Sequence, residues 1–133
     1  MKIAVSSTGR DPTSNVEAHF GRCPGFLIVD PEKGDYEYLD NSAVGSAHGA
    51  GIQAAQLLAS KGVSAVLSGN VGPNAYGALT AAGIQVFTGV TGLVSEAVDR
   101  YAKGEFTTVK GPTVGGHFGT GGAGGLGRGR RQR

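Results

Sequence analysis

Cysteine is almost absent from this chain of 133 residues: Cys23 is the only one, and tryptophan does not occur. A single cysteine excludes a disulfide within the chain, and it excludes a zinc or iron–sulfur site built from several cysteines of one subunit. Any metal chemistry must therefore use mixed ligands, a second subunit, or a cluster that brings its own sulfur.

Long apolar runs are missing as well. No stretch approaches the roughly 20 apolar residues that a helix needs to cross a bilayer. The strand-like residues 1–5 are followed at once by Ser6, Ser7 and Thr8, so the beginning of the chain lacks the apolar core of a signal peptide. These absences predict a protein without membrane contact, and a cytoplasmic location is the expectation.

Acidic residues are missing from the C-terminal part of the chain. Residues 1–110 hold 8 Lys/Arg against 10 Asp/Glu, a net charge of −2, whereas residues 111–133 hold 4 arginines and no acid, a net charge of +4. Those last 23 residues also contain 10 of the 25 glycines and almost nothing that could form a core. The composition predicts one folded domain over residues 1–110 and a disordered Gly/Arg-rich tail over residues 111–133.

Within the domain, short apolar runs alternate with turn residues. Five runs predict strands, at residues 2–6, 26–29, 35–39, 65–67 and 84–87. Three helical patterns end at glycines and predict helices over residues 50–61, 73–82 and 93–103. Their inward faces are predicted to include Ile52, Ala55 and Ala59 in the first helix, and Ala82 in the second. This order of elements predicts an α/β fold, a three-layer sandwich around a mixed sheet.

Four glycine-containing loops, at residues 20–25, 45–51, 68–74 and 89–92, are predicted at the carboxyl edge of that sheet, where such folds bind ligands. The last three lead into helix N-termini, whose N–H groups and dipole favour an anion. Loop 68–74 is the clearest of them, with Gly69, Asn70, Gly72 and Asn74 as candidate binding residues. It matches neither the P-loop nor the dinucleotide-binding pattern, and a plain tight turn is the alternative interpretation.

Residues 19–24 bring together side chains with ligand chemistry. His19 offers an imidazole, Arg22 a fixed cation, and Cys23 a thiol that the arginine and nearby helix N-termini are expected to acidify. His48 offers a second imidazole in a loop at the same edge. His19, Cys23 and His48 are therefore the candidate metal ligands. The alternative is that His19 caps a turn and Cys23 packs as a small hydrophobic residue.

Several of these segments, in this order and spacing, resemble the dinitrogenase iron–molybdenum cofactor biosynthesis family, which includes NifX, the C-terminal part of NifB and the orange protein of sulfate-reducing bacteria. The similar segments are residues 1–5, His19–Arg22 with Pro24 and residues 26–30, then residues 48–52 and 69–74. The resemblance covers residues 1 to about 105. It implies a ribonuclease H-like fold with a five-stranded sheet of order 3-2-1-4-5, whose second strand is antiparallel, and three helices.

The resemblance also implies a function without catalysis: binding or carriage of a metal–sulfide cluster that contains molybdenum together with copper or iron, and that an apo form would lack. Recurrent family positions are matched by His19, Arg22, His48, Gly69, Gly72 and Asn74, whereas Cys23 stands where a small residue such as alanine is common. The implied partners are the cluster and the proteins that donate or accept it. The expected state is a monomer or a weak homodimer, since the predicted edge strand at residues 35–39 could pair between subunits.

Three other functions are alternatives to cluster binding. A ribonuclease H-like nuclease needs acidic residues on the first strand to hold paired metal ions, and residues 2–6 contain none. A hydrolase or transferase for a small phosphate needs a nucleophile, a base and an orienting group, and no such set is visible. A nucleic-acid or protein interaction through the Gly/Arg tail stays open as the alternative, although four arginines support only weak, salt-sensitive binding to nucleic acid.

Overall fold

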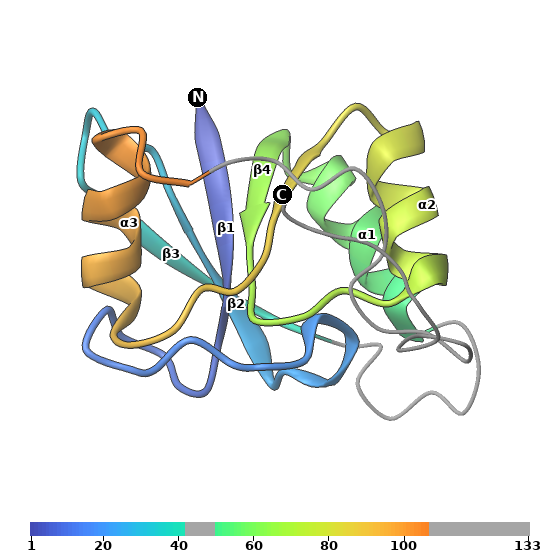
Figure 1. Cartoon of the computed structure of the whole chain (residues 1–133), viewed down its shortest axis with the longest axis horizontal. Helices are drawn as coiled ribbons and strands as arrows, with labels where there is room; N and C mark the ends of the chain where they lie inside the picture. The colour runs from blue at the N-terminus through green and yellow to red at the C-terminus, as the bar shows by residue number, and fades with distance from the viewer. Residues whose placement is uncertain (42–49, 107–133) are drawn as a thin grey trace, which may run out of the picture.

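The middle layer of the molecule is a five-stranded mixed sheet (Figure 1). The computed structural model describes residues 1–41 and 50–106. The strands are β1 (Lys2–Ser7), β2 (Gly25–Val29), β3 (Tyr36–Asp40), β4 (Val63–Leu67) and β5 (Gln85–Phe87). Their order is β3-β2-β1-β4-β5, with β2 antiparallel to both of its neighbours and β4 parallel to β1 and β5. The predicted three-layer α/β fold and the implied strand order are confirmed.

Helices cover both faces of this sheet (Figure 1). Helices α1 (Ala50–Ser60) and α2 (Pro73–Ala81) pack together on one face, and α3 (Val94–Ala102) packs on the other. The alternation of β1 explains the two cores: Ala4 faces α1 and α2, whereas Ile3 and Val5 face α3. All five residues of β2 are buried, as expected for a strand with a helix layer on each side.

The inward faces of two helices differ from the sequence prediction. In α1 the buried residues are Ala54, Ala55 and Leu58, while Ile52 is 37% exposed and Ala59 is exposed. Ala82, the C-cap of α2, is exposed as well. In a short alanine-rich helix several faces are similarly apolar, so the sequence does not show which face is buried. Packing against the neighbouring helix decides it. Within the described residues, no helix has the length and apolar character that crossing a membrane requires.

A long connection after β1 crosses the carboxyl end of the sheet. It forms isolated bridges from Ser7 to Val16, from Asn15 to Leu93 and from His19 to Asn70. At α3, the N–H of Val94 donates to the Ser14 carbonyl at 2.9 Å and that of Ser95 to the Pro12 carbonyl at 3.0 Å. The N-terminus of α3 is therefore already satisfied by the protein's own backbone.

Candidate functional site: a cleft at the carboxyl edge of the sheet

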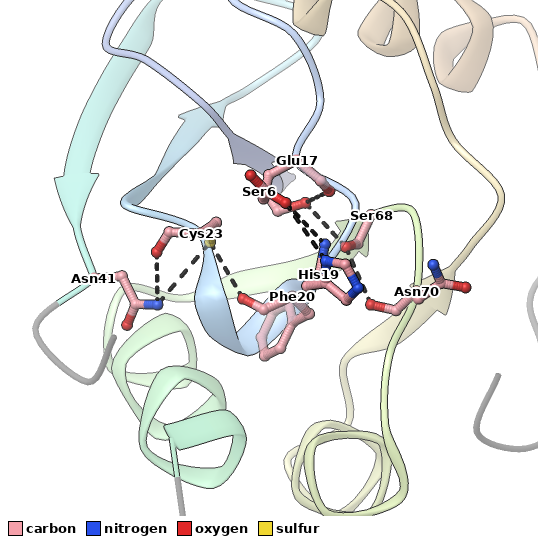
Figure 2. A network of polar contacts seen from close by, with 8 residues as sticks. All are labelled: Ser6, Glu17, His19, Phe20, Cys23, Asn41, Ser68 and Asn70. Carbon is pink, nitrogen blue, oxygen red and sulfur yellow. Dashed lines mark hydrogen bonds and ion pairs between the residues drawn. The ribbon is translucent and has the colours of Figure 1, made fainter. Parts of the chain in front are cut away.

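His19 and Asn70 lie side by side in a short parallel bridge between two loops (Figure 2). The N–H of Asn70 donates to the Ala18 carbonyl at 2.7 Å, and the N–H of Phe20 donates to the Asn70 carbonyl at 3.1 Å. Phe20 anchors the first loop, because its buried ring packs on Phe26 with 5.3 Å between centroids. The short 3₁₀ turn η1 (Phe20–Arg22) follows directly and presents Arg22 to solvent.

Beside this bridge the structure forms a cleft of about 400 Å³. It lies between the first loop, the start of α1 and the start of α2. Its lining comprises His19, Phe20, Gly21, Arg22, Ala50, Gly51, Asn70, Gly72, Pro73, Asn74 and Ala75. A second cleft of about 430 Å³ near the amino end of β1 has no histidine, cysteine or arginine in its lining. The first cleft is therefore the candidate site.

The first cleft is receptive to anions. Among the described residues that line it, none is aspartate or glutamate, and the Arg22 side chain is exposed at its wall. Helix α2 begins with Pro73 after an N-cap, Gly72, that provides no side-chain cap. The N–H groups of Asn74 and Ala75 belong to the first helical turn, so they have no carbonyl partner within the helix. A bound anion would accept their hydrogen bonds and interact favourably with the helix dipole.

Two glycines bring the walls of the cleft close together. A Cβ on Gly69 would lie 2.7 Å from the Cα of Ala18 and 2.8 Å from its carbonyl oxygen. A Cβ on Gly51 would lie 2.8 Å from the Cβ of Ala75, where α1 meets α2. Real Cβ atoms essentially never approach another heavy atom this closely, so both positions require glycine for the observed packing.

Cys23 lies behind the cleft and does not line it. Its side chain is fully buried, and its thiol donates to the Phe20 carbonyl at 3.2 Å. Burial raises the pKa of the Cys23 thiol to about 12, and the charge of Glu17 adds to the rise. The predicted acidification by Arg22 is therefore wrong, because loss of hydration outweighs the hydrogen bonds that favour a thiolate. Cys23 packs as a small hydrophobic residue.

The predicted site residues thus separate into three groups. His19, Arg22, Asn70, Gly72 and Asn74 line one cleft together, Gly69 forms the close contact behind it, and Cys23 is buried away from it. His48 lies outside the described residues. Among the residues that the structure describes, no three His, Cys, Asp or Glu side chains gather to hold a metal ion.

Four polar residues that position this site are not among the predicted site residues: Ser6, Glu17, Asn41 and Ser68 (Figure 2). Asn41 is buried, and its amide donates to the Cys23 carbonyl at 3.0 Å and to the Gly21 carbonyl at 3.3 Å. The serines carried one usable signal, since each directly follows an apolar strand run and those strands were predicted to be parallel. Glu17 and Asn41 carried none, because their contacts depend on how the loops fold back.

The fold and the cleft define a small α/β domain with a cleft at the carboxyl edge of its sheet, lined by His19, Arg22 and the start of α2. The chain belongs to the dinitrogenase iron–molybdenum cofactor family, whose profile matches residues 1–104. The uncharacterized protein MJ0580 of Methanocaldococcus jannaschii is 36% identical over 110 residues, which is 79% of this chain and 88% of that protein.

Solved structures agree with this assignment. The apo form of the orange protein from Desulfovibrio gigas superposes with a TM-score of 0.81 at 43% identity, covering 84% of this chain and 94% of that one. The Thermotoga protein TM1290 gives a TM-score of 0.71 at 38% identity, covering 80% of this chain and 91% of its own. The described fold is therefore that of these relatives.

Proposed function

We propose that this chain binds and carries an anionic metal–sulfide cluster in the cleft between the His19–Arg22 loop and the start of α2. The observation that supports this most directly is the convergence of Arg22, His19 and the uncapped N-terminus of α2 around a cleft without lining carboxylates. Membership of the dinitrogenase iron–molybdenum cofactor family and the likeness to the orange protein support a cluster-binding or carrier role in general.

The chemistry of the cleft suits a group that brings its own sulfur. Sulfides of such a cluster accept hydrogen bonds from the N–H groups of Asn74 and Ala75, and Arg22 balances part of the negative charge. Few protein ligands are then needed, which fits the absence of a three-ligand cluster among the described residues. The imidazole of His19 suits a soft metal ion at the cluster's rim. Molybdenum with copper or iron is our proposal for the metals.

The cleft is proposed to hold its cargo without transforming it. Among the described lining residues, His19 has the one imidazole, and neither serine nor cysteine accompanies it as a nucleophile. The proposed partners are proteins that donate or accept the cluster in the cytoplasm. The sheet order and its antiparallel second strand support the ribonuclease H-like class for this carrier.

The test is titration of the anaerobic apo-protein with tetrathiomolybdate, alone and with copper or iron. We expect a chromophore that stays with the protein through gel filtration, and amide resonance shifts for residues 19–22 and 69–75. Arg22→Gln should weaken binding about tenfold, since a hydrogen bond to a charged group is worth about 1.5–3 kcal/mol.

Arg10→Gln is the matched control, because Arg10 is exposed and interacts with Asp40 and the Tyr38 ring outside the cleft. Its affinity should equal that of the wild type. A chromophore that separates from the protein, or resonance shifts confined to residues outside the cleft, would reject the proposal. Elemental analysis after anaerobic purification from the native host identifies the metals.

The division between domain and tail is also a proposal. A variant ending at Lys110 retains every described residue and the whole of the family match. We expect this variant to bind tetrathiomolybdate like the full chain, whereas any retention of RNA by the full chain should disappear with the four tail arginines. Loss of tetrathiomolybdate binding on truncation would place part of the site in residues 111–133.

A further inference from the structure

The backbone of Glu17 is hydrogen-bonded to β1 and to the turn that follows β4. Its N–H donates to the Ser6 carbonyl at 2.8 Å, and its carbonyl accepts the Ser6 hydroxyl at 2.9 Å. The N–H of Gly69 reaches the same carbonyl at 3.4 Å. Glu17 is therefore fixed just before the bridge that places His19 at the cleft.

The side chain of Glu17 turns toward His19 (Figure 2). One carboxylate oxygen, Oε2, accepts the backbone N–H of His19 at 3.3 Å and lies 3.7 Å from the Nδ1 atom of its imidazole. The second distance is longer than a direct hydrogen bond and is within ion-pair range. The Glu17 side chain is 26% exposed and that of His19 is 56% exposed, so the carboxylate is the more constrained partner.

We infer that Glu17 is a positioning residue that selects the tautomer of His19. The negative charge of the carboxylate, 3.7 Å from Nδ1, repels a nitrogen lone pair and attracts an N–H, so the imidazole nitrogen that faces it carries the proton. With Nδ1 protonated, the neutral ring has its lone pair on Nε2, on the side turned away from Glu17. Proteins generally orient a metal-binding imidazole in this way. The carboxylate interacts with the N–H of one ring nitrogen, and the other ring nitrogen binds the metal ion.

The competing interpretation of Glu17 is that its charge repels an anionic cargo. The two effects predict opposite outcomes. Removal of a repelling charge strengthens the binding of a polyanion, whereas removal of a positioning group weakens it. The tautomer depends on the structure alone, while the use of Nε2 as a ligand rests on the proposed function.

The first test is the ring nitrogen spectrum of the apo-protein labelled with ¹⁵N-histidine. It is recorded about two pH units above the ordinary histidine pKa of about 6.5, where the ring is neutral. His19→Gln assigns the signal among the three histidines. We expect the Nδ1-protonated form in the wild type and the Nε2-protonated form, which free histidine favours in water, in Glu17→Ala. An Nε2-protonated His19 in the wild type would overturn the inference, with no variant required.

The second test measures tetrathiomolybdate binding in the presence of Cu(I). Glu17→Ala should bind about tenfold more weakly, the usual effect of losing a carboxylate behind a ligating histidine. Glu17→Asp should recover part of the affinity and of the tautomer. Glu37→Ala is the control, because Glu37 pairs with Lys61 at 3.0 Å on the exposed edge strand. Tighter binding by Glu17→Ala would assign repulsion as its role and refute positioning.

These tests separate the two proposals. If the wild type takes up no tetrathiomolybdate but His19 shows the expected tautomer change, the proposed cargo is wrong and the positioning role stands. If uptake is normal and the tautomer ignores Glu17, the positioning role is wrong and the proposed function stands. A variant with the wild-type amide spectrum outside residues 15–22 shows that the fold is intact.

Discussion

The hydroxyl of Ser6 lies 2.9 Å from the hydroxyl of Ser68, and both side chains are fully buried. They sit just beyond Val5 and Leu67, which are partners in the parallel pair of β1 and β4. Each hydroxyl has one proton to donate. The two shortest contacts are satisfied when Ser68 donates to Ser6 and Ser6 donates to the Glu17 carbonyl. Two strands are thereby joined to the loop that forms the wall of the cleft.

This pair predicts a non-additive effect on stability. Ser6→Ala should lower the free energy of unfolding by about 1–3 kcal/mol, because it removes the hydroxyl that donates to the Glu17 carbonyl and accepts from Ser68. Ser68→Ala should cost less, and the double variant should cost less than the two together by about 0.5 kcal/mol or more. Urea unfolding measures all three. Ser60→Ala, at an exposed helix position, is the control, and strictly additive losses would contradict the coupling.

Gly69→Ala should open the cleft wall. The new Cβ would meet the backbone of Ala18 at 2.7–2.8 Å, so the bridge between His19 and Asn70 has to separate. We expect a loss of about 1–3 kcal/mol in unfolding free energy, together with loss of tetrathiomolybdate binding. Amide shifts of residues 17–20 report the displacement.

Gly77→Ala is the matched control for this substitution. Gly77 lies in the middle of α2, and a Cβ there meets nothing within 4 Å. Alanine is the better helix former, so this variant should be more stable by about 0.5–1 kcal/mol and should bind like the wild type. If both glycine variants lost stability and binding equally, the close approach of Gly69 to Ala18 would not be the cause of the loss in Gly69→Ala.

The buried thiol of Cys23 predicts a loss of stability at high pH. Its pKa rises from 9.0 to about 12 on folding, so above pH 9 the unfolded chain releases a proton that the folded chain retains. Its contribution is therefore complete below pH 9 and declines between pH 9 and about 12, by about 1.4 kcal/mol per pH unit.

Cys23→Ala removes this dependence, and urea unfolding of both proteins at pH 7 and about pH 10 isolates it. Burial also raises the pKa values of three tyrosines, Tyr36, Tyr38 and Tyr101. Both proteins contain them, so their contribution to the pH dependence cancels in the comparison. Tetrathiomolybdate binding should be unchanged in Cys23→Ala. An equal pH dependence of the two proteins would show that the thiol is accessible and ionises in the folded state.

Asn41→Asp should destabilise the loop more than Asn41→Ala does. The amide of Asn41 donates to the carbonyls of Gly21 and Cys23, and a carboxylate at the same place would face them without a proton to donate. We expect losses of about 1–3 kcal/mol for alanine and more for aspartate at neutral pH. The difference should shrink in acid, where the carboxyl regains a proton. Urea unfolding at pH 7 and about pH 4 tests this, and equal losses at both would contradict it.

Much of the fold could be predicted because it rests on local patterns. The short apolar runs that became β1 and β4, and Pro73 at the start of α2, are readable signals of strand and helix. The strand order itself came from the family resemblance. The inward face of α1 could not be read, since Ile52 suits a buried face by its own chemistry. The close contact of Gly51 with Ala75 sets the rotation of the helix instead.

For the site, the sequence predicted that the loops at residues 20–25 and 68–74 lie at one edge of the sheet, and the structure brings His19, Arg22 and Asn74 together there. The sequence misjudged Cys23, because the effect of a neighbouring arginine on a thiol depends on whether the thiol faces water or the core. The sequence also predicted a third anion-binding helix N-terminus, that of α3 after residues 89–92. In the structure the first N–H groups of α3 already donate to the carbonyls of Pro12 and Ser14.

The sequence by itself determined the class of fold, the edge of the sheet where the candidate site lies, and the residue types available there, because periodicity and turn chemistry are local properties. Only the tertiary structure decided that His19 stands beside Asn70 at the cleft, that Glu17 faces its imidazole, and that Cys23 is withdrawn into the core. Burial and contact depend on chain segments that are distant in sequence. No local pattern states how two loops will lie once the strands beneath them pair.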